Sequence, residues 1–134
     1  YFKEIVFIWI SSAISIIIVV NFLLKGLWGR GRPNDLLYFE GNYLFTPWFK
    51  PSNFCESNCS FVSGDASVGF LVIVLYFLTK NIWFFYFGLF SGSALGLVRI
   101  AEGGHFLSDI IFAQIIVTFS LLASFVLYKK IYDK

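Results

Sequence analysis

Long apolar runs separated by polar links dominate the chain. Ile5–Leu24 and Ile82–Val98 carry no charged residue, and Ile110–Tyr128 has only Gln114 as a clearly polar member. A helix of about 20 residues crosses the hydrocarbon core of a bilayer, so each run has roughly the length of a membrane span. This pattern predicts an all-α fold built from transmembrane helices.

A shorter apolar run, Ala66–Thr79, has two interpretations. It is either a helix buried within the protein or a membrane span that begins one turn earlier, near Ser63. We predict it to be the second of four spans in a transmembrane helix bundle. The whole chain, residues 1–134, then forms a single domain.

Residues 25–65, between the first two predicted spans, form a long polar stretch. They contain all three prolines and both cysteines, which predicts a loop with a short interfacial helix. Cys55 and Cys59 either pair in an oxidising compartment or remain two free thiols. Aromatic side chains of this loop either cover a site where lipid enters sideways or anchor the loop among headgroups: Tyr38, Phe39, Tyr43, Phe45, Trp48 and Phe49.

The composition also favours a membrane protein. Charged residues make up 13% of the chain and hydrophobic residues 58%, whereas soluble domains have about 25% charged residues. The net charge of +2 is too small to predict nucleic-acid binding. The chain has no methionine and opens with Tyr1, so we expect it to be incomplete at its N-terminus.

The distribution of charge predicts the orientation in the membrane. Four alternating spans place the start of the chain, Lys80 and the C-terminal tail on one side, which carries five lysines and two acidic residues. The other side carries five basic and six acidic residues. Because cytoplasmic segments have an excess of basic residues, we predict a cytoplasmic C-terminus and an extracytoplasmic loop over residues 25–65.

Gly88, Gly92 and Gly96 recur every four residues in the third predicted span. Small residues at this spacing let two helices approach closely, either within one chain or between two copies. We predict packing within the chain, and the sequence leaves the oligomeric state open.

Alternation of the spans brings residues that are distant in sequence to one membrane face: Lys25, Arg32, Asp65, Arg99, His105 and Asp109. His105 is the only histidine, and Asp109 follows it at the spacing of two side chains on one helix face. A carboxylate that holds one imidazole nitrogen leaves the other free to attack or to transfer a proton. Without further support, such a pair is more typical of a stabilised helix start.

Three cations at the same face favour a phosphate ligand. The guanidinium groups of Arg32 and Arg99 bind phosphate oxygens in pairs, and Lys25 adds a point charge. A simpler interpretation is that basic side chains extend toward lipid headgroups. It accounts for the position of Lys25, but it does not account for three cations grouped at the same face as His105. Ser63 and Gly64 either offer backbone N–H groups to an anion or act as ordinary helix caps.

In order and spacing, these motifs resemble those of the type 2 phosphatidic acid phosphatase family, relatives of the vanadium haloperoxidases. Lys25–Pro33 has the form K-x6-R-P, and Arg99–Asp109 has the form R-x5-H-x3-D. Ser63-Gly64-Asp65 lies between them. The resemblance implies an all-helical membrane core, normally of six spans with the site at the outer face, of which these four spans would be the last four.

The resemblance also implies residue roles. The groups that would hold the phosphate are Lys25, Arg32, Arg99, the Ser63 side chain and the Gly64 backbone N–H. His105 would attack phosphorus and become phosphohistidine, and Asp109 would orient it. The family requires no metal or other cofactor, and one histidine without a cluster of cysteines does not make an ordinary zinc site.

Two positions depart from the family pattern. Asp65 stands where the family has a histidine that protonates the leaving oxygen, and Val98 stands where it usually has serine. Loss of the serine hydroxyl costs about 1 kcal/mol. An aspartic acid is ordinarily ionised at neutral pH; a nearby substrate phosphate would favour its protonated form, whereas Arg32 and Arg99 would favour the ionised form, and the sequence leaves the outcome open. If Asp65 is a poor general acid, good leaving groups, as in lipid diphosphates or sugar phosphates, are favoured over simple monoesters.

The sequence therefore predicts an integral membrane phosphatase that acts on a lipid phosphate, and the family resemblance implies that it needs no metal and lies in a bacterial inner membrane. The sequence does not distinguish among several candidate substrates, which include phosphatidic acid, phosphatidylglycerol phosphate, undecaprenyl diphosphate and lipid A phosphates. One alternative is a catalytically impaired relative that binds phospholipid headgroups. Another is a structural membrane subunit whose charged residues face protein partners.

Overall fold

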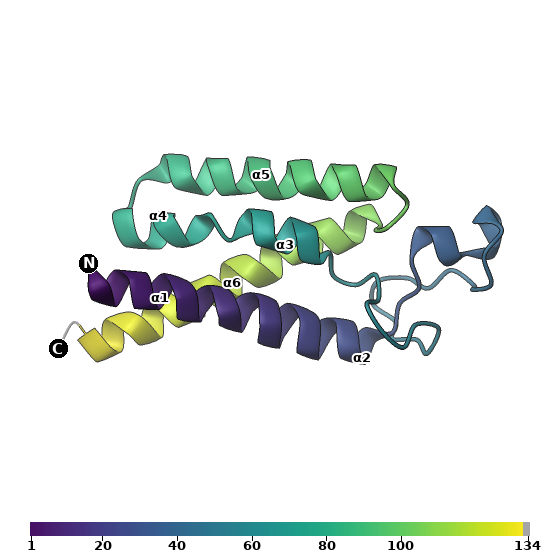
Figure 1. Ribbon diagram of the computed structural model, residues 1–134, viewed down its shortest axis with the longest axis horizontal. Helices are drawn as coiled ribbons and strands as arrows, with labels where there is room; N and C mark the ends of the chain where they lie inside the picture. The colour runs from purple at the N-terminus through teal and green to yellow at the C-terminus, as the bar shows by residue number, and fades with distance from the viewer. Residues whose placement is uncertain (133–134) are drawn as a thin grey trace.

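The computed structural model describes residues 1–132, and these residues form an all-helical bundle of four long segments (Figure 1). The first segment begins with α1 (Phe2–Ala13), continues as the π-helix η1 (Ile14–Lys25) and ends with the short α2 (Gly26–Trp28). Gly29 follows with a φ of 58°, a left-handed conformation that glycine adopts at no steric cost, and it stops the helix there.

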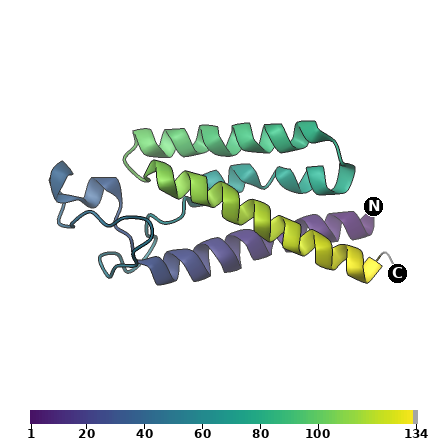
Figure 2. The ribbon, with the colours of Figure 1, turned by 180° about the vertical axis from the view of Figure 1, so that it is seen from behind.

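The second segment consists of α3 (Gly64–Phe70) and α4 (Ile73–Thr79), which are separated by a turn. A tight link leads into α5 (Ile82–Ala101), whose first turn is capped because the Asn81 side chain accepts a hydrogen bond from the Trp83 backbone. The last segment is α6 (Leu107–Tyr132), which crosses the bundle obliquely in Figure 2.

Three stretches among residues 1–132 are long and apolar enough to cross a membrane: Phe2–Asp35, Ile82–Ala101 and Leu107–Tyr132. The helix over Gly64–Thr79 is apolar but shorter. It begins next to Ser63, one turn before the apolar run, as one of the two interpretations requires. The predicted all-α bundle of membrane helices is therefore confirmed, with three helices of spanning length.

The glycine stripe of α5 packs inside the bundle. Gly88, Gly92 and Gly96 are all buried. A Cβ atom added to Gly69 of α3 would lie only 2.6 Å from the Gly92 backbone, so α3 and α5 touch at two facing glycines. A Cβ atom on Gly96 would lie 2.7 Å from Ile110 of α6. The prediction of packing within the chain is confirmed.

One end of the bundle carries the long loop and the link between α5 and α6, and we call it the loop end (Figure 1). The chain termini and the link between α4 and α5 lie at the opposite end. The loop runs over residues 29–63 and contains two short 3-10 helices, η2 (Pro33–Asp35) and η3 (Leu37–Phe39). It is shorter at both ends than predicted, because Lys25 lies in η1 and Asp65 lies in α3.

Candidate active site

The residues predicted to converge all belong to elements that meet at the loop end (Figure 1). Lys25 is the last residue of η1, and Gly64 and Asp65 open α3. Arg99 lies in the last turn of α5, and Asp109 lies in the first turn of α6. His105 lies in the link between these two helices.

His105 is buried, and a backbone carbonyl holds its imidazole ring. Only 2% of the residue is exposed. Its Nδ1 lies 2.7 Å from the carbonyl oxygen of Ser60. A carbonyl oxygen can only accept a hydrogen bond, so Nδ1 carries the proton and donates it. In the neutral ring, Nε2 then has a free lone pair, which is the state required of a nucleophile or a general base.

Asp109 lies beside the imidazole without making the predicted hydrogen bond to it. The distance from His105 Nδ1 to Asp109 Oδ2 is 3.6 Å, which is suitable for an ion pair when the ring is protonated but too long for a hydrogen bond. The physical reason is that α6 begins at Leu107, so His105 precedes the helix. The four-residue spacing therefore does not stack the two side chains on one helix face.

The Asp109 carboxylate is fully buried and is bound on all sides by donors. Its Oδ1 accepts a hydrogen bond from Arg30 Nη1 at 2.6 Å. Its Oδ2 accepts from the Ser60 hydroxyl at 2.5 Å and from the Phe106 backbone N–H at 2.9 Å. Ser60 thus contacts both predicted partners, since its carbonyl holds His105 and its hydroxyl holds Asp109.

No sequence motif predicts a role for Arg30 or Ser60. Arg30 lies within the K-x6-R-P motif, two residues before Arg32, and in the sequence its charge looks like that of any loop arginine. Its burial is the distinguishing feature, since only 2% of the residue is exposed. Ser60 acts partly through its backbone, which no side-chain pattern reveals. The two glycines that flank Arg30 are the one local signal of a close approach.

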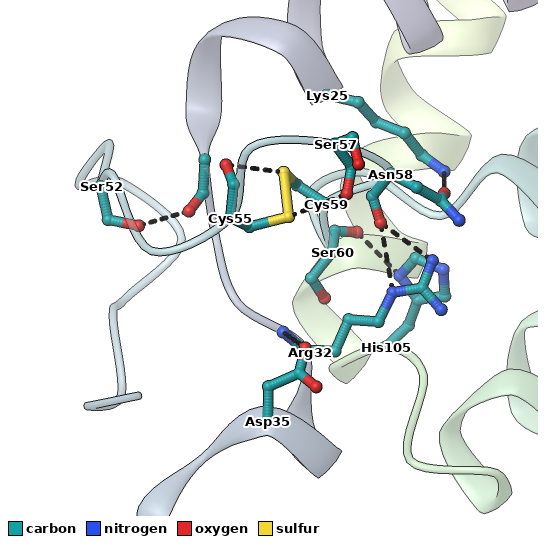
Figure 3. Close-up of a disulfide and its surroundings, with 11 residues drawn as sticks. Lys25, Arg32, Asp35, Ser52, Cys55, Ser57, Asn58, Cys59, Ser60 and His105 are labelled. Carbon is teal, nitrogen blue, oxygen red and sulfur yellow. Dashed lines mark hydrogen bonds between the residues drawn. A yellow bond between two sulfur atoms is a disulfide. The ribbon is translucent and has the colours of Figure 1, made fainter. Parts of the chain in front are cut away.

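Lys25 and Arg32 meet at a single residue, Asn58 (Figure 3). Lys25 Nζ donates to the Asn58 side-chain oxygen at 3.0 Å. Arg32 donates from Nε and Nη2 to the Asn58 carbonyl oxygen at 3.2 and 2.9 Å. A Cβ atom on Gly64 would lie 3.3 Å from Lys25 Nζ, so the ammonium group also packs against the start of α3. The structure therefore brings Lys25, Arg32 and Gly64 together.

A disulfide closes the turn that presents Asn58. Cys55 and Cys59 are bonded, with their Cα atoms 5.6 Å apart, so of the two states left open by the sequence the structure contains the disulfide (Figure 3). Asn58 lies inside this closed turn, and Ser60 follows it directly. The same short segment thus supplies acceptors to Lys25, to Arg32 and to His105.

Arg99 is paired with two carboxylates at the loop end. Its Nε lies 2.9 Å from Asp65 Oδ2, and its Nη1 lies 2.6 Å from Glu102 Oε2. All three side chains are partly exposed, so these pairs contribute little to stability and can exchange with another anion. A Cβ atom on Gly104 would lie 3.7 Å from Arg99 Cζ, which brings the guanidinium next to the residue before His105.

Ser63 caps α3, as the simpler of its two interpretations requires. Its hydroxyl accepts a long hydrogen bond from the Ala66 N–H at 3.4 Å. Its own N–H donates to the Asp109 carbonyl at 3.2 Å, which ties the start of α3 to the start of α6. Ser63 is fully buried at the junction of these two helices.

A groove opens beside His105. It has a volume of about 470 Å³, and its walls include Asn34, Phe39 and Gly103. Asn34 fixes this wall, because its backbone N–H donates to the Gly103 carbonyl and its side chain donates to the Glu102 carbonyl. Phe39, an exposed aromatic residue of the loop, and His105 both line this groove, whereas Lys25, Arg32 and Arg99 are not among its lining residues.

The chain is similar in sequence to curated phosphatases. The chain is 40% identical to a lipid A 4'-phosphatase of Francisella tularensis subsp. novicida over 100% of the chain and 61% of that relative. It is 34% identical to a lipid A 4'-phosphatase of Rhizobium leguminosarum, over 80% of the chain and 48% of the relative. A third lipid A 4'-phosphatase, from Rhizobium etli, is 35% identical over 70% of the chain and 38% of the relative.

The chain thus spans less than two thirds of the length of these curated relatives. No solved structure matches it. The family model described as the PAP2 superfamily matches residues 6–133, which include every residue predicted for the site. The chain belongs to the PAP2 superfamily.

Proposed function

We propose that this chain carries the active site of a membrane phosphatase that removes a phosphate group from a lipid, with lipid A as the leading substrate. The observation that carries the proposal is the state of His105, whose Nδ1–H is held by a carbonyl and whose Nε2 makes no hydrogen bond within residues 1–132. Family membership and the names of the relatives support the same function.

The proposed reaction has two steps. In the first, His105 Nε2 attacks phosphorus, the bond to the leaving oxygen breaks, and the phosphoryl group becomes attached to the imidazole. The leaving oxygen takes a proton from Asp65 or from water. In the second, water attacks the phosphohistidine, which releases inorganic phosphate and restores the free ring. Lys25, Arg32 and Arg99 bind the phosphate oxygens, with Ser63 and the Gly64 N–H assisting, and they offset the developing charge.

We place this site on the extracytoplasmic face of a bacterial inner membrane, with the C-terminus in the cytoplasm. The lysine excess at the opposite end of the bundle supports this orientation, and so does the disulfide, because such bonds persist in oxidising compartments. We also propose α3 and α4 as the second of four spans, since both pack along α5. From the family resemblance we also propose a six-span core for the whole protein, of which these would be the last four spans.

A panel of substrates tests the function. Full-length protein in detergent micelles is given bisphosphorylated lipid A, phosphatidic acid, phosphatidylglycerol phosphate and undecaprenyl diphosphate, and free phosphate is measured. We expect release from lipid A to be fastest, with no added metal. Absence of release from every lipid would contradict the proposal.

One observation favours the alternative of an impaired relative that binds headgroups. Asp65 is engaged in an ion pair with Arg99, and an ionised carboxylate does not donate a proton. Binding of the same lipids to micelle-embedded protein, without release of phosphate, would support this second function.

Replacement of Asp65 by histidine tests its role as the proton donor. A histidine can donate a proton near neutral pH, and general-acid catalysis is worth about 100-fold or more. We expect Asp65→His to raise kcat on phosphatidic acid, whose alkoxide is a poor leaving group, by about tenfold, and to change kcat on a prenyl diphosphate by less than about twofold. Asp65→Asn is the control, because it breaks the Arg99 pair without adding an acid. Equal increases on both substrates would contradict the leaving-group argument.

Reduction of the disulfide should lower activity. The Cys55–Cys59 bond closes the turn that carries Asn58 and precedes Ser60, so an open turn holds the cations and the imidazole less firmly. We expect kcat/KM to fall about tenfold, equivalent to about 1.4 kcal/mol of lost positioning. Steady-state rates with and without a phosphine reductant measure this. The double variant Cys55→Ala, Cys59→Ala should show the same loss and no response to reductant, and a fully active double variant would refute the prediction.

A further inference from the structure

Arg30 is the one buried arginine among residues 1–132, and it lies outside the groups that contact phosphate in the proposed reaction. Its guanidinium donates to Asp109, to the Ser108 hydroxyl at 2.9 Å and, through Nε, to the Thr46 carbonyl at 3.0 Å. The Phe106 ring covers one face, 4.1 Å from the guanidinium carbon. Protein groups thus occupy the Arg30 guanidinium, and Arg30 is not among the residues that line the groove beside His105.

A continuous chain of contacts leads from Arg30 to the imidazole. Arg30 holds one oxygen of Asp109, and the other oxygen accepts the Ser60 hydroxyl. The Ser60 carbonyl in turn accepts the Nδ1–H of His105. Because Asp109 itself lies 3.6 Å from Nδ1, the hydrogen bond that orients the ring comes from Ser60.

We propose that Arg30 is a positioning residue for His105, and that it acts through Asp109 and Ser60. The inference rests on the proposed function. The Arg30 guanidinium holds the Asp109 carboxylate and through it the Ser60 hydroxyl, and the Arg30 backbone carbonyl accepts a hydrogen bond from the Ser60 N–H at 2.8 Å. Together these contacts position the Ser60 carbonyl. That carbonyl keeps the proton on Nδ1 and leaves Nε2 aimed at phosphorus. Outer contacts of this kind set the tautomer and direction of a reactive imidazole.

Arg30 has a second, purely structural task, which is to balance the buried charge of Asp109. The substitution Arg30→Lys separates the two tasks. It keeps the positive charge but loses the planar fork that bridges Asp109, Ser108 and Thr46 at once. Ser60→Ala breaks the chain of contacts at its next step and leaves no buried cation or anion without its partner.

The kinetic test uses full-length protein and bisphosphorylated lipid A in detergent micelles. We expect Arg30→Lys to lower kcat about 10- to 100-fold, with KM within about twofold of wild type, because Arg30 does not contact substrate. Ser60→Ala should lower kcat in the same way. The double variant should be no more than about twofold slower than the slower single variant, since both act on one path. Lys50→Met, at an exposed loop position, serves as the control.

A spectroscopic test needs no turnover. Protein labelled with [15N]histidine gives imidazole resonances, and the pair missing from His105→Gln belongs to His105. We expect wild type to have the proton on Nδ1, and Arg30→Lys and Ser60→Ala to show a mixture of the two tautomers. A merely structural role would lower thermal stability and leave the tautomer unchanged.

The outcomes are distinct. A wild-type kcat in Arg30→Lys overturns the inference, and so does a lower kcat with an unchanged tautomer or a large change in KM. If Arg30→Lys does not fold, Ser60→Ala decides, and a wild-type kcat and tautomer there overturn the inference. If wild-type protein releases no phosphate while the tautomer still responds to Arg30→Lys, the proposed function fails and the positioning role stands.

Discussion

His105→Gln should lower kcat by at least about 10³-fold, as loss of a nucleophile does in other enzymes. The reason is that the proposed reaction depends on the Nε2 atom of a single imidazole, whose Nδ1–H is held by the Ser60 carbonyl. Glutamine keeps an N–H that can donate to the Ser60 carbonyl, so the fold of the loop end should survive. Phosphate release from bisphosphorylated lipid A measures the loss, and thermal unfolding in micelles checks the fold.

The same variant also tests the proposed intermediate. Substrate labelled in its phosphate should leave an acid-labile, base-stable label on rapidly quenched wild-type protein, and none on His105→Gln. Lys50→Met should retain both the label and the rate. Appreciable turnover by His105→Gln would mean that another group attacks phosphorus, and the reaction proposed here would be wrong.

Arg99→Met should lower kcat/KM about 10²- to 10³-fold, equivalent to about 3–4 kcal/mol of transition-state stabilisation. The Arg99 guanidinium lies next to Gly104 in the link that carries His105, and its present partners are exposed carboxylates that an incoming phosphate can replace. Arg99→Lys should recover part of the loss, because lysine keeps the charge without the bidentate fork. Initial rates over a range of lipid concentration separate kcat from KM.

Glu102→Gln provides a matched control for Arg99. It removes one ion-pair partner of the guanidinium and leaves the guanidinium in place. We expect it to change kcat/KM by less than about threefold, as for other exposed pairs. If Arg99→Met were no worse than Glu102→Gln, the guanidinium would serve only these surface pairs.

The helices and the end at which the site lies were predictable, because apolar run length and helix alternation depend on local sequence. Alternation alone brought Lys25, Asp65, Arg99 and Asp109 to one end, as in the structure. The boundary of α6 was less accessible. The prediction that Asp109 bonds to His105 assumed a helix through both residues, but the helix begins at Leu107.

Interactions of the irregular loop could not be predicted from side-chain pattern. Asn58 and Ser60 act through carbonyl oxygens, which every residue has, and their positions depend on the path of the loop. Arg30 and Arg32 stand two residues apart with the same chemistry, yet one is buried and the other holds Asn58 near the surface. Only the tertiary fold distinguishes them, because no periodic sequence pattern indicates which loop residues are buried.

The contact of Asn58 with two cations bears on how a charged ligand would enter. Lys25 and Arg32 repel each other, and two oxygens of one residue keep them at a set spacing. An arriving phosphate would exchange its own oxygens for those of an amide and a peptide group, both uncharged and easily displaced. The phosphate oxygens would then replace the Asn58 oxygens as hydrogen-bond acceptors of Lys25 and Arg32. Because both cations are already in position, their side chains would rearrange little when the anion binds.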